Sequence, residues 1–167
     1  NHMAPEISQE QVTQFTKATK KVFMVYDPRL DIPIEQRWAA PLFEKMPPYS
    51  SALRKGLAAS VVQMALRKDA VLSGSGQTIA NSIVRSILVS KDQPATSKIW
   101  RSASSWLPDL AEASPEVFLE ACEELIHNKD IAEELFEEGE APFLCSAHTY
   151  LLWALERLAW SSKLLTR

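Results

Sequence analysis

Glycine and cysteine are both scarce in this sequence of 167 residues, which contains four glycines, two cysteines and ten prolines. Few glycines argue against a fold built from tight hairpins, whereas spaced prolines favour helices with definite ends. No stretch of five or more residues alternates between apolar and polar side chains, so no β-sheet is predicted. The sequence also shows no pattern of a secretory leader and no apolar run long enough to span a bilayer.

The two cysteines, Cys122 and Cys145, each lie within an apolar helical pattern. Cysteines in this setting are typical of reduced, buried thiols and not of a disulfide framework. We therefore expect a cytoplasmic protein without a structural disulfide.

Recognisable arrangements of catalytic or metal-binding residues are missing too. The glycine-containing loop Ser73–Thr78 precedes a predicted helix, but it lacks the lysine that ends a phosphate-binding P-loop. Cys145 and His148 share a helix face. Zinc needs about four ligands, and the other candidates, Cys122 and His127, belong to a different helix. Since Cys122 also lies on the inner side of its helix, where thiols are inert, we predict no catalytic residue, no metal site and no cofactor.

The acidic residues are concentrated in one part of the chain. Residues 112–140 contain eleven acids and one base, and the remainder contains ten acids and seventeen bases, within a net charge of −3. One interpretation is a solvated helical face; the other is a docking surface for a basic partner. The carboxylates that we expect to form such a surface are Glu133, Glu134, Glu137 and Glu138. The bases elsewhere are scattered, so nucleic-acid binding is not expected.

Apolar periodicity and capping residues predict seven helical segments, at about residues 8–26, 33–46, 50–68, 77–91, 97–111, 114–128 and 142–160. A short turn through Leu135 and Phe136 is expected between the last two. The second segment has an apolar side, which consists of Trp38, Leu42 and Phe43.

Three smaller features of these segments are also predicted. Gly56 is expected to be a point of close packing in the third segment, on which Leu53 lies on the apolar stripe. The clearest cap is Ser114-Pro115, with serine at the N-cap and proline at the first helical position. The segment at 77–91 carries a clean amphipathic stripe that includes Ile83 and Ile87.

The last predicted helix is apolar nearly all round, and such a helix must be covered on every side. Its apolar residues fall into two sectors. Leu151, Leu155 and Leu158 occupy one sector, which we predict to pack inward. Trp153 and Trp160 are seven residues apart and lie along another side. We predict that this second sector is partly exposed or is covered by a second copy, so both tryptophans are candidate interface residues.

Three stretches carry a resemblance to a known group of proteins. They are Leu30–Ala40 (LDIPIEQRWAA), Tyr49–Ala58 (YSSALRKGLA) and His148–Trp160 (HTYLLWALERLAW). Together they resemble the helical region of very large, poorly characterised bacterial proteins. Some of these look like multidomain NTPases with helical-repeat sensor arms, of the kind tied to anti-phage defence. The shared motifs are structural, so no active-site residue carries over. The resemblance implies that the chain is an excised segment whose sequence continues past Arg167.

These observations together predict an all-α protein of antiparallel helix pairs, arranged as a bundle or a short HEAT-like repeat segment. Residues 1–3 are typical of a remnant left by tag removal, which leaves 4–167 as a single helical domain. The expected function is a non-enzymatic scaffold that binds protein, either other domains of the parent chain or a second copy. The alternative is a regulatory domain that binds a small ligand in a pocket lined by tryptophans.

Overall fold

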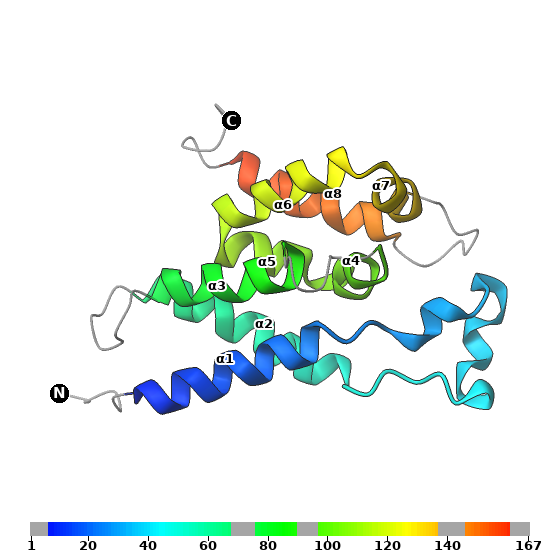
Figure 1. The fold of residues 1–167 in the computed structure, drawn as a ribbon, viewed down its shortest axis with the longest axis horizontal. Helices are drawn as coiled ribbons and strands as arrows, with labels where there is room; N and C mark the ends of the chain where they lie inside the picture. The colour runs from blue at the N-terminus through cyan, green and yellow to red at the C-terminus, as the bar shows by residue number, and fades with distance from the viewer. Residues whose placement is uncertain (1–6, 68–75, 90–96, 137–145, 161–167) are drawn as a thin grey trace.

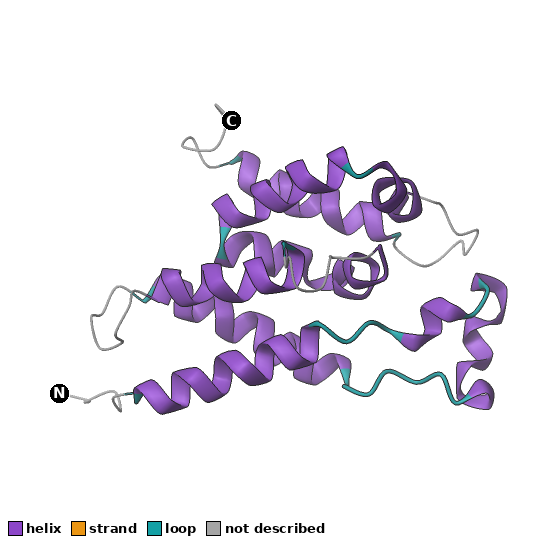
Figure 2. Ribbon diagram, in the orientation of Figure 1, coloured by secondary structure: helices purple, strands orange, loops and turns teal. Residues whose placement is uncertain are grey.

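The computed structural model describes residues 7–67, 76–89, 97–136 and 146–160. Every regular element in this part of the chain is helical (Figure 2), which confirms the predicted all-α class. None of the described helices is both long and apolar enough to cross a bilayer. The elements, with η marking a 3-10 helix, are α1 (Gln9–Phe23), η1 (Pro28–Asp31), η2 (Ile34–Phe43), α2 (Ser51–Leu66), α3 (Gly76–Leu88), α4 (Ser97–Ala103), η3 (Ser104–Trp106), α5 (Leu107–Ala113), α6 (Pro115–His127), α7 (Lys129–Phe136) and α8 (Ala147–Ala159).

α1 and α2 each begin after a serine whose side chain caps the helix. The Ser8 side chain accepts a hydrogen bond from the Gln11 N–H, and the Gln11 side chain accepts one from the Ser8 N–H. At the start of α2, the Ser50 side chain accepts from the Leu53 N–H at 3.2 Å. These bonds satisfy N–H groups that the first turn of a helix leaves without partners.

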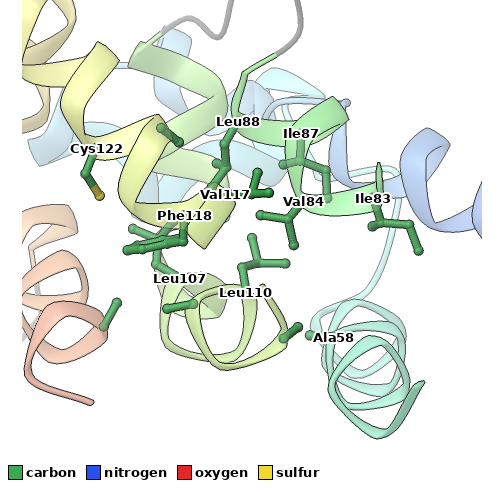
Figure 3. Packing of buried hydrophobic residues seen from close by; sticks show 14 of the residues in the cluster. Ala58, Ile83, Val84, Ile87, Leu88, Leu107, Leu110, Val117, Phe118 and Cys122 are labelled. Atoms are coloured by element: carbon green, nitrogen blue, oxygen red, sulfur yellow. The ribbon is translucent and has the colours of Figure 1, made fainter. Parts of the chain in front are cut away.

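The core lies where α5 meets α2, α3, α6 and α8 (Figure 1). Figure 3 shows Leu107 and Leu110 of α5 beside Phe118 of α6 and Val84 of α3, and all four side chains are buried. The predicted stripe of α3 is confirmed, since it faces this cluster. Trp100 of α4 closes the core, with its ring centroid 6.4 Å from that of Phe118.

Proline divides the fifth predicted segment into α4, η3 and α5. Pro108 lies in the first turn of α5, where its missing N–H costs no hydrogen bond. The sixth segment begins at Pro115 as predicted, but Ser114 does not cap it. The Ser114 hydroxyl is buried and donates instead to Asn81 Oδ1 of α3 at 2.7 Å. This serine therefore joins two helices in place of capping one.

Three further predictions are wrong. The expected turn at Leu135 and Phe136 is the end of a regular helix, α7, which buries Leu135. Gly56 is not a point of close packing, because a Cβ at this position would meet nothing within 4 Å. Leu53, expected on the inner stripe of α2, is exposed. The predicted start of the last helix at Pro142 lies outside the described residues.

The connection between α1 and α2, residues 24–50, extends away from the helical body and is called the arm (Figure 1). It contains η1 and η2, and the carboxylate of Asp31 ties it to α4. One Asp31 oxygen pairs with Lys98 of α4 and the other with Lys45 of the arm. The Lys98 ammonium also lies 5.0 Å from the ring centroid of Tyr26. An ion pair, a cation–π contact and the hydrogen bond from the Asp27 N–H to the Ser102 hydroxyl thus link the arm to α4.

The arm contradicts the prediction that Trp38, Leu42 and Phe43 form the inner side of a helix. All three side chains are exposed, and the buried residues of η2 are Ala39 and Ala40. The reason is the helix type. With three residues per turn, side chains four apart no longer share a face, and Pro41 within η2 cannot donate a hydrogen bond.

Candidate interaction surface

The inner face of α8 is fixed against the body of the protein. Leu151, Ala154 and Leu158 are buried, and Leu155 packs partly buried against the core. The helix lies mainly on α5, so the prediction that the leucine sector packs inward is confirmed. These contacts hold α8 in a definite orientation and leave its opposite face outward.

That outward face carries three large exposed apolar side chains, with the exposed Glu156 between Leu152 and Trp160. Leu152 is 56% exposed, Trp153 is 46% exposed and Trp160 is 84% exposed. The Tyr150 ring meets the Trp153 ring edge-on, with 5.3 Å between their centroids. This confirms the prediction that the tryptophan sector lies at least partly exposed. We call Leu152, Trp153 and Trp160 the α8 face; clustered exposed apolar side chains of this size are characteristic of interaction sites.

A polar contact borders the α8 face and secures the helix. The Arg157 guanidinium donates to Glu112 Oε2 at 2.9 Å and lies 3.8 Å from Asp109 Oδ1. Both carboxylates belong to α5. Apolar side chains next to charged ones are common where the core of a protein–protein interface meets its polar rim.

The glutamates predicted as a docking surface lie elsewhere. Glu133 and Glu134 are exposed on α7, and Glu137 and Glu138 fall outside the described residues. The carboxylate of Glu134 accepts a hydrogen bond from the Ser97 hydroxyl of α4, so this residue has a structural contact. α7 lies at the N-terminal end of α8 (Figure 1), where the Phe136 ring stacks on His148.

Trp160 is at the other end of α8, about 18 Å away at 1.5 Å per residue. The structure therefore does not join the two predicted groups into one site.

The acidic segment lines a shallow hollow between α6 and α7. Its lining residues are Glu120, Glu123, Glu124, His127, Asn128, Lys129 and Asp130. Arg85 of α3 forms an ion pair with Glu120 and so offsets part of the negative charge. The hollow is wide open to solvent and charged, which fits a solvated face.

The five tryptophans do not gather around a common pocket. Trp38 lies on the arm, Trp100 in the core and Trp106 on η3, while Trp153 and Trp160 lie on α8. This distribution lends no support to a ligand pocket lined by tryptophans.

Sequence reasoning missed a second apolar surface, on the arm. Trp38 is 82% exposed, and Leu42, Phe43 and Met46 are exposed with it. The signal in the sequence was the spacing of the prolines, which interrupts the region before and after η2 at Pro33 and Pro47. Such spacing disfavours a continuous amphipathic helix.

Among the described residues, the side chains that could act in catalysis or bind a metal are either unreactive or not grouped together. Burial, with a smaller contribution from Glu123, raises the pKa of the Cys122 thiol to about 12, so a reactive thiolate is not formed near neutral pH. His127 Nδ1 lies 2.6 Å from the Glu123 carbonyl oxygen. No group of three or more metal-ligating side chains occurs in the described ranges, and Cys145 lies outside them.

A search with family models, with curated proteins and with solved structures finds no match to this chain.

Proposed function

We propose that this chain is a non-enzymatic helical scaffold segment of a larger bacterial protein and that it binds protein through the α8 face. The observation that carries the proposal is the cluster of large exposed apolar side chains on the side of α8 opposite its buried side. One side packs on α5, whereas Leu152, Trp153 and Trp160 point outward. Burial of a large apolar side chain contributes about 1.5–3 kcal/mol, so an exposed face of this kind gains much from a partner.

The proposed occupant of the α8 face is a second apolar helix surface, either in another domain of the parent protein or in another copy of this chain. Tryptophan is one of the residues enriched among those that contribute most of the binding energy at protein interfaces. Trp153 and Trp160 are one heptad apart, which is the spacing at which a facing helix can contact both. A second copy is the partner that can be tested with the purified chain alone.

The test compares two substitutions at tryptophans of matched exposure. Trp160→Glu places a negative charge on the α8 face. Trp38→Glu makes the same chemical change on the arm, and the two side chains are similarly exposed, at 82% for Trp38 and 84% for Trp160. Both variants should keep the wild-type circular dichroism spectrum, since neither side chain is in the core. Sedimentation equilibrium and light scattering should show self-association of the wild type and of Trp38→Glu.

Trp160→Glu should weaken self-association by about thirtyfold or more, which corresponds to about 2 kcal/mol for a central interface tryptophan. A monomeric wild type at high concentration, or equal weakening by both substitutions, would remove the support for the α8 face as an interface. Unfolding of Trp160→Glu would show that the residue belongs to the fold.

A further inference from the structure

The arm has internal contacts that make it a unit of its own. η1 and η2 contact each other, and Arg37 Nε of η2 donates to the carbonyl oxygens of Arg29 and Ile32, each at 3.1 Å. Ile32, Ala39 and Ala40 are buried, but none of them belongs to the apolar core of the body. The hydrogen bonds and the buried side chains of the arm are therefore separate from that core.

Two connections join the arm to α1 and α2, and neither contains a helix. They are residues 24–27 and 44–50 (Figure 1). Arg54 of α2 is buried and fixes the first connection, since its Nη2 donates to the Val25 carbonyl at 3.0 Å and its Nη1 to the Ser102 carbonyl at 3.4 Å. Because Val25 is held on the body in this way, a movement of the arm must begin beyond Val25.

Asp31 of η1 contacts the arm with one carboxylate oxygen and the body with the other. Its Oδ2 accepts hydrogen bonds from Lys45 Nζ and from the Tyr26 hydroxyl, each at 3.3 Å, and both partners belong to the arm. Its Oδ1 pairs with Lys98 of α4 at 2.5 Å. The hydrogen bond from Lys98 is the main cause that lowers the pKa of Asp31 below its ordinary value. The Asp31 carboxylate is therefore charged near neutral pH.

A second contact with α4 lies one helical turn further along. The Asp27 N–H donates to the Ser102 hydroxyl at 2.7 Å. Lys98 and Ser102 are four residues apart in α4, so they share one side of this helix. A movement that separates Asp31 from Lys98 therefore also draws the Asp27 N–H away from its acceptor.

We propose that Asp31 and Lys98 form a latch, and that the arm moves away from α4 as one unit when this ion pair breaks. The side chains of Lys98 and Asp31 are 44% and 24% exposed, and exposed ion pairs are weak and are screened by salt. Opening also leaves Asp31 with Lys45 and Tyr26, so its charge keeps a partner. The closed and open positions are thus close in free energy, and ionic strength shifts the balance between them.

Opening of the latch changes how the arm presents its apolar surface. Trp38 and Leu42 of η2 are exposed and move with the arm. A protein that binds this surface in only one of the two positions would shift the balance toward that position. The latch is separate from the α8 face and does not depend on it.

Hydrogen exchange followed by NMR tests the latch, because the Asp27 N–H bonds across it. Its exchange rate reports the population of the open position when reclosing is fast. Asp31→Asn should accelerate this exchange about two- to fivefold, the factor that an exposed ion pair supplies. Lys98→Gln should accelerate it about fivefold or more, because this variant also loses the cation–π contact with Tyr26. Added salt should accelerate exchange in the wild type, but much less in Asp31→Asn.

Two controls make the same chemical changes at other positions. Lys45→Gln removes the other ammonium group from Asp31 but leaves the latch, so the Asp27 N–H should exchange at the wild-type rate. Glu120→Gln breaks an exposed ion pair with Arg85 between α6 and α3, and it should also leave that rate unchanged. Each variant should keep the wild-type circular dichroism spectrum.

Two amides inside the arm distinguish movement as one unit from unfolding. The Ile32 N–H donates to the Arg29 carbonyl at 3.1 Å, and the Lys45 N–H donates to the Ala40 carbonyl at 3.0 Å. Both amides should exchange at the wild-type rate in Lys98→Gln, since these bonds do not cross the latch.

Wild-type exchange of the Asp27 N–H in both Asp31→Asn and Lys98→Gln overturns the latch, and so does equal acceleration in either control. Equal acceleration of all three amides in Lys98→Gln shows that the arm unfolds, which overturns its movement as one unit. Trp160→Glu should keep the wild-type rate at Asp27, which separates this result from that of the α8 face.

Discussion

Gly76 and Gly56 form a matched pair for testing how α2 and α3 pack. Both are glycines in described helices, at the start of α3 and in the middle of α2. A Cβ added to Gly76 would lie 1.9 Å from the Met64 carbonyl oxygen and 3.3 Å from that of Arg67. A Cβ added to Gly56 would meet nothing within 4 Å. Substitution by alanine therefore introduces a steric clash at Gly76 and fills open space at Gly56.

The two substitutions should change the free energy of unfolding in opposite directions. Ordinary contact with a Cβ begins near 3.4 Å, so Gly76→Ala must move the start of α3 away from the end of α2 by about 1.5 Å. The obstructing atom belongs to the backbone and cannot rotate aside. Overpacking of this kind costs about 1–3 kcal/mol. Gly56→Ala should instead stabilise the protein by about 0.5–1 kcal/mol, because alanine loses less conformational entropy in a helix.

Urea and thermal unfolding followed by circular dichroism should measure both changes. A protein of this size loses about 2–4 °C in Tm for each kcal/mol, so Gly76→Ala should fall by about 2–12 °C while Gly56→Ala rises slightly. Wild-type stability in Gly76→Ala would show that α2 and α3 do not meet at this point. A loss of stability in Gly56→Ala would mean that its surroundings are closed.

Two further predictions concern α6 and α7. Glu134→Lys should lower the free energy of unfolding in urea by about 1 kcal/mol, because it removes the acceptor of the buried Ser97 hydroxyl. The control Glu133→Lys should change it by about 0.5 kcal/mol or less. Equal effects of the two substitutions would contradict the contact between Glu134 and Ser97. Burial raises the pKa of the Cys122 thiol to about 12. At pH 8, its reaction with iodoacetamide should therefore be slower in the native protein than in the urea-unfolded protein by a factor of about a hundred or more, as measured by peptide mapping. Rapid labelling of the native protein would show that the thiol is accessible.

Several elements could be predicted from the sequence because their causes are local. Ser8 and Ser50 cap their helices through bonds that span three residues, so the pattern of side chains is sufficient to locate them. The stripe of α3 and the two sides of α8 follow from the period of the helix. For the same reason the exposure of Trp153 and Trp160 could be predicted, although no partner for them could be named.

Other features depended on contacts between segments far apart in the chain. Ser114 has the local pattern of a cap, yet its hydroxyl bonds Asn81 because burial against α3 makes that partner available. Gly76, and not Gly56, is the glycine that allows close approach, since the approaching atoms come from another helix. In both cases, contacts between helices outweigh the conformational preference of the local sequence.

The sequence by itself determined that this protein is helical, where most of its helices begin and which side of α8 faces inward, because hydrogen bonds and side-chain periodicity within a helix depend on neighbouring residues. Only the tertiary structure decided that the arm leaves the body with Trp38 exposed and that Arg54 of α2 hydrogen-bonds the main chain of Val25 and of Ser102. These two partners are 29 and 48 residues away from Arg54 in the chain. No local pattern predicts this proximity, because it arises when helices from distant parts of the chain pack together.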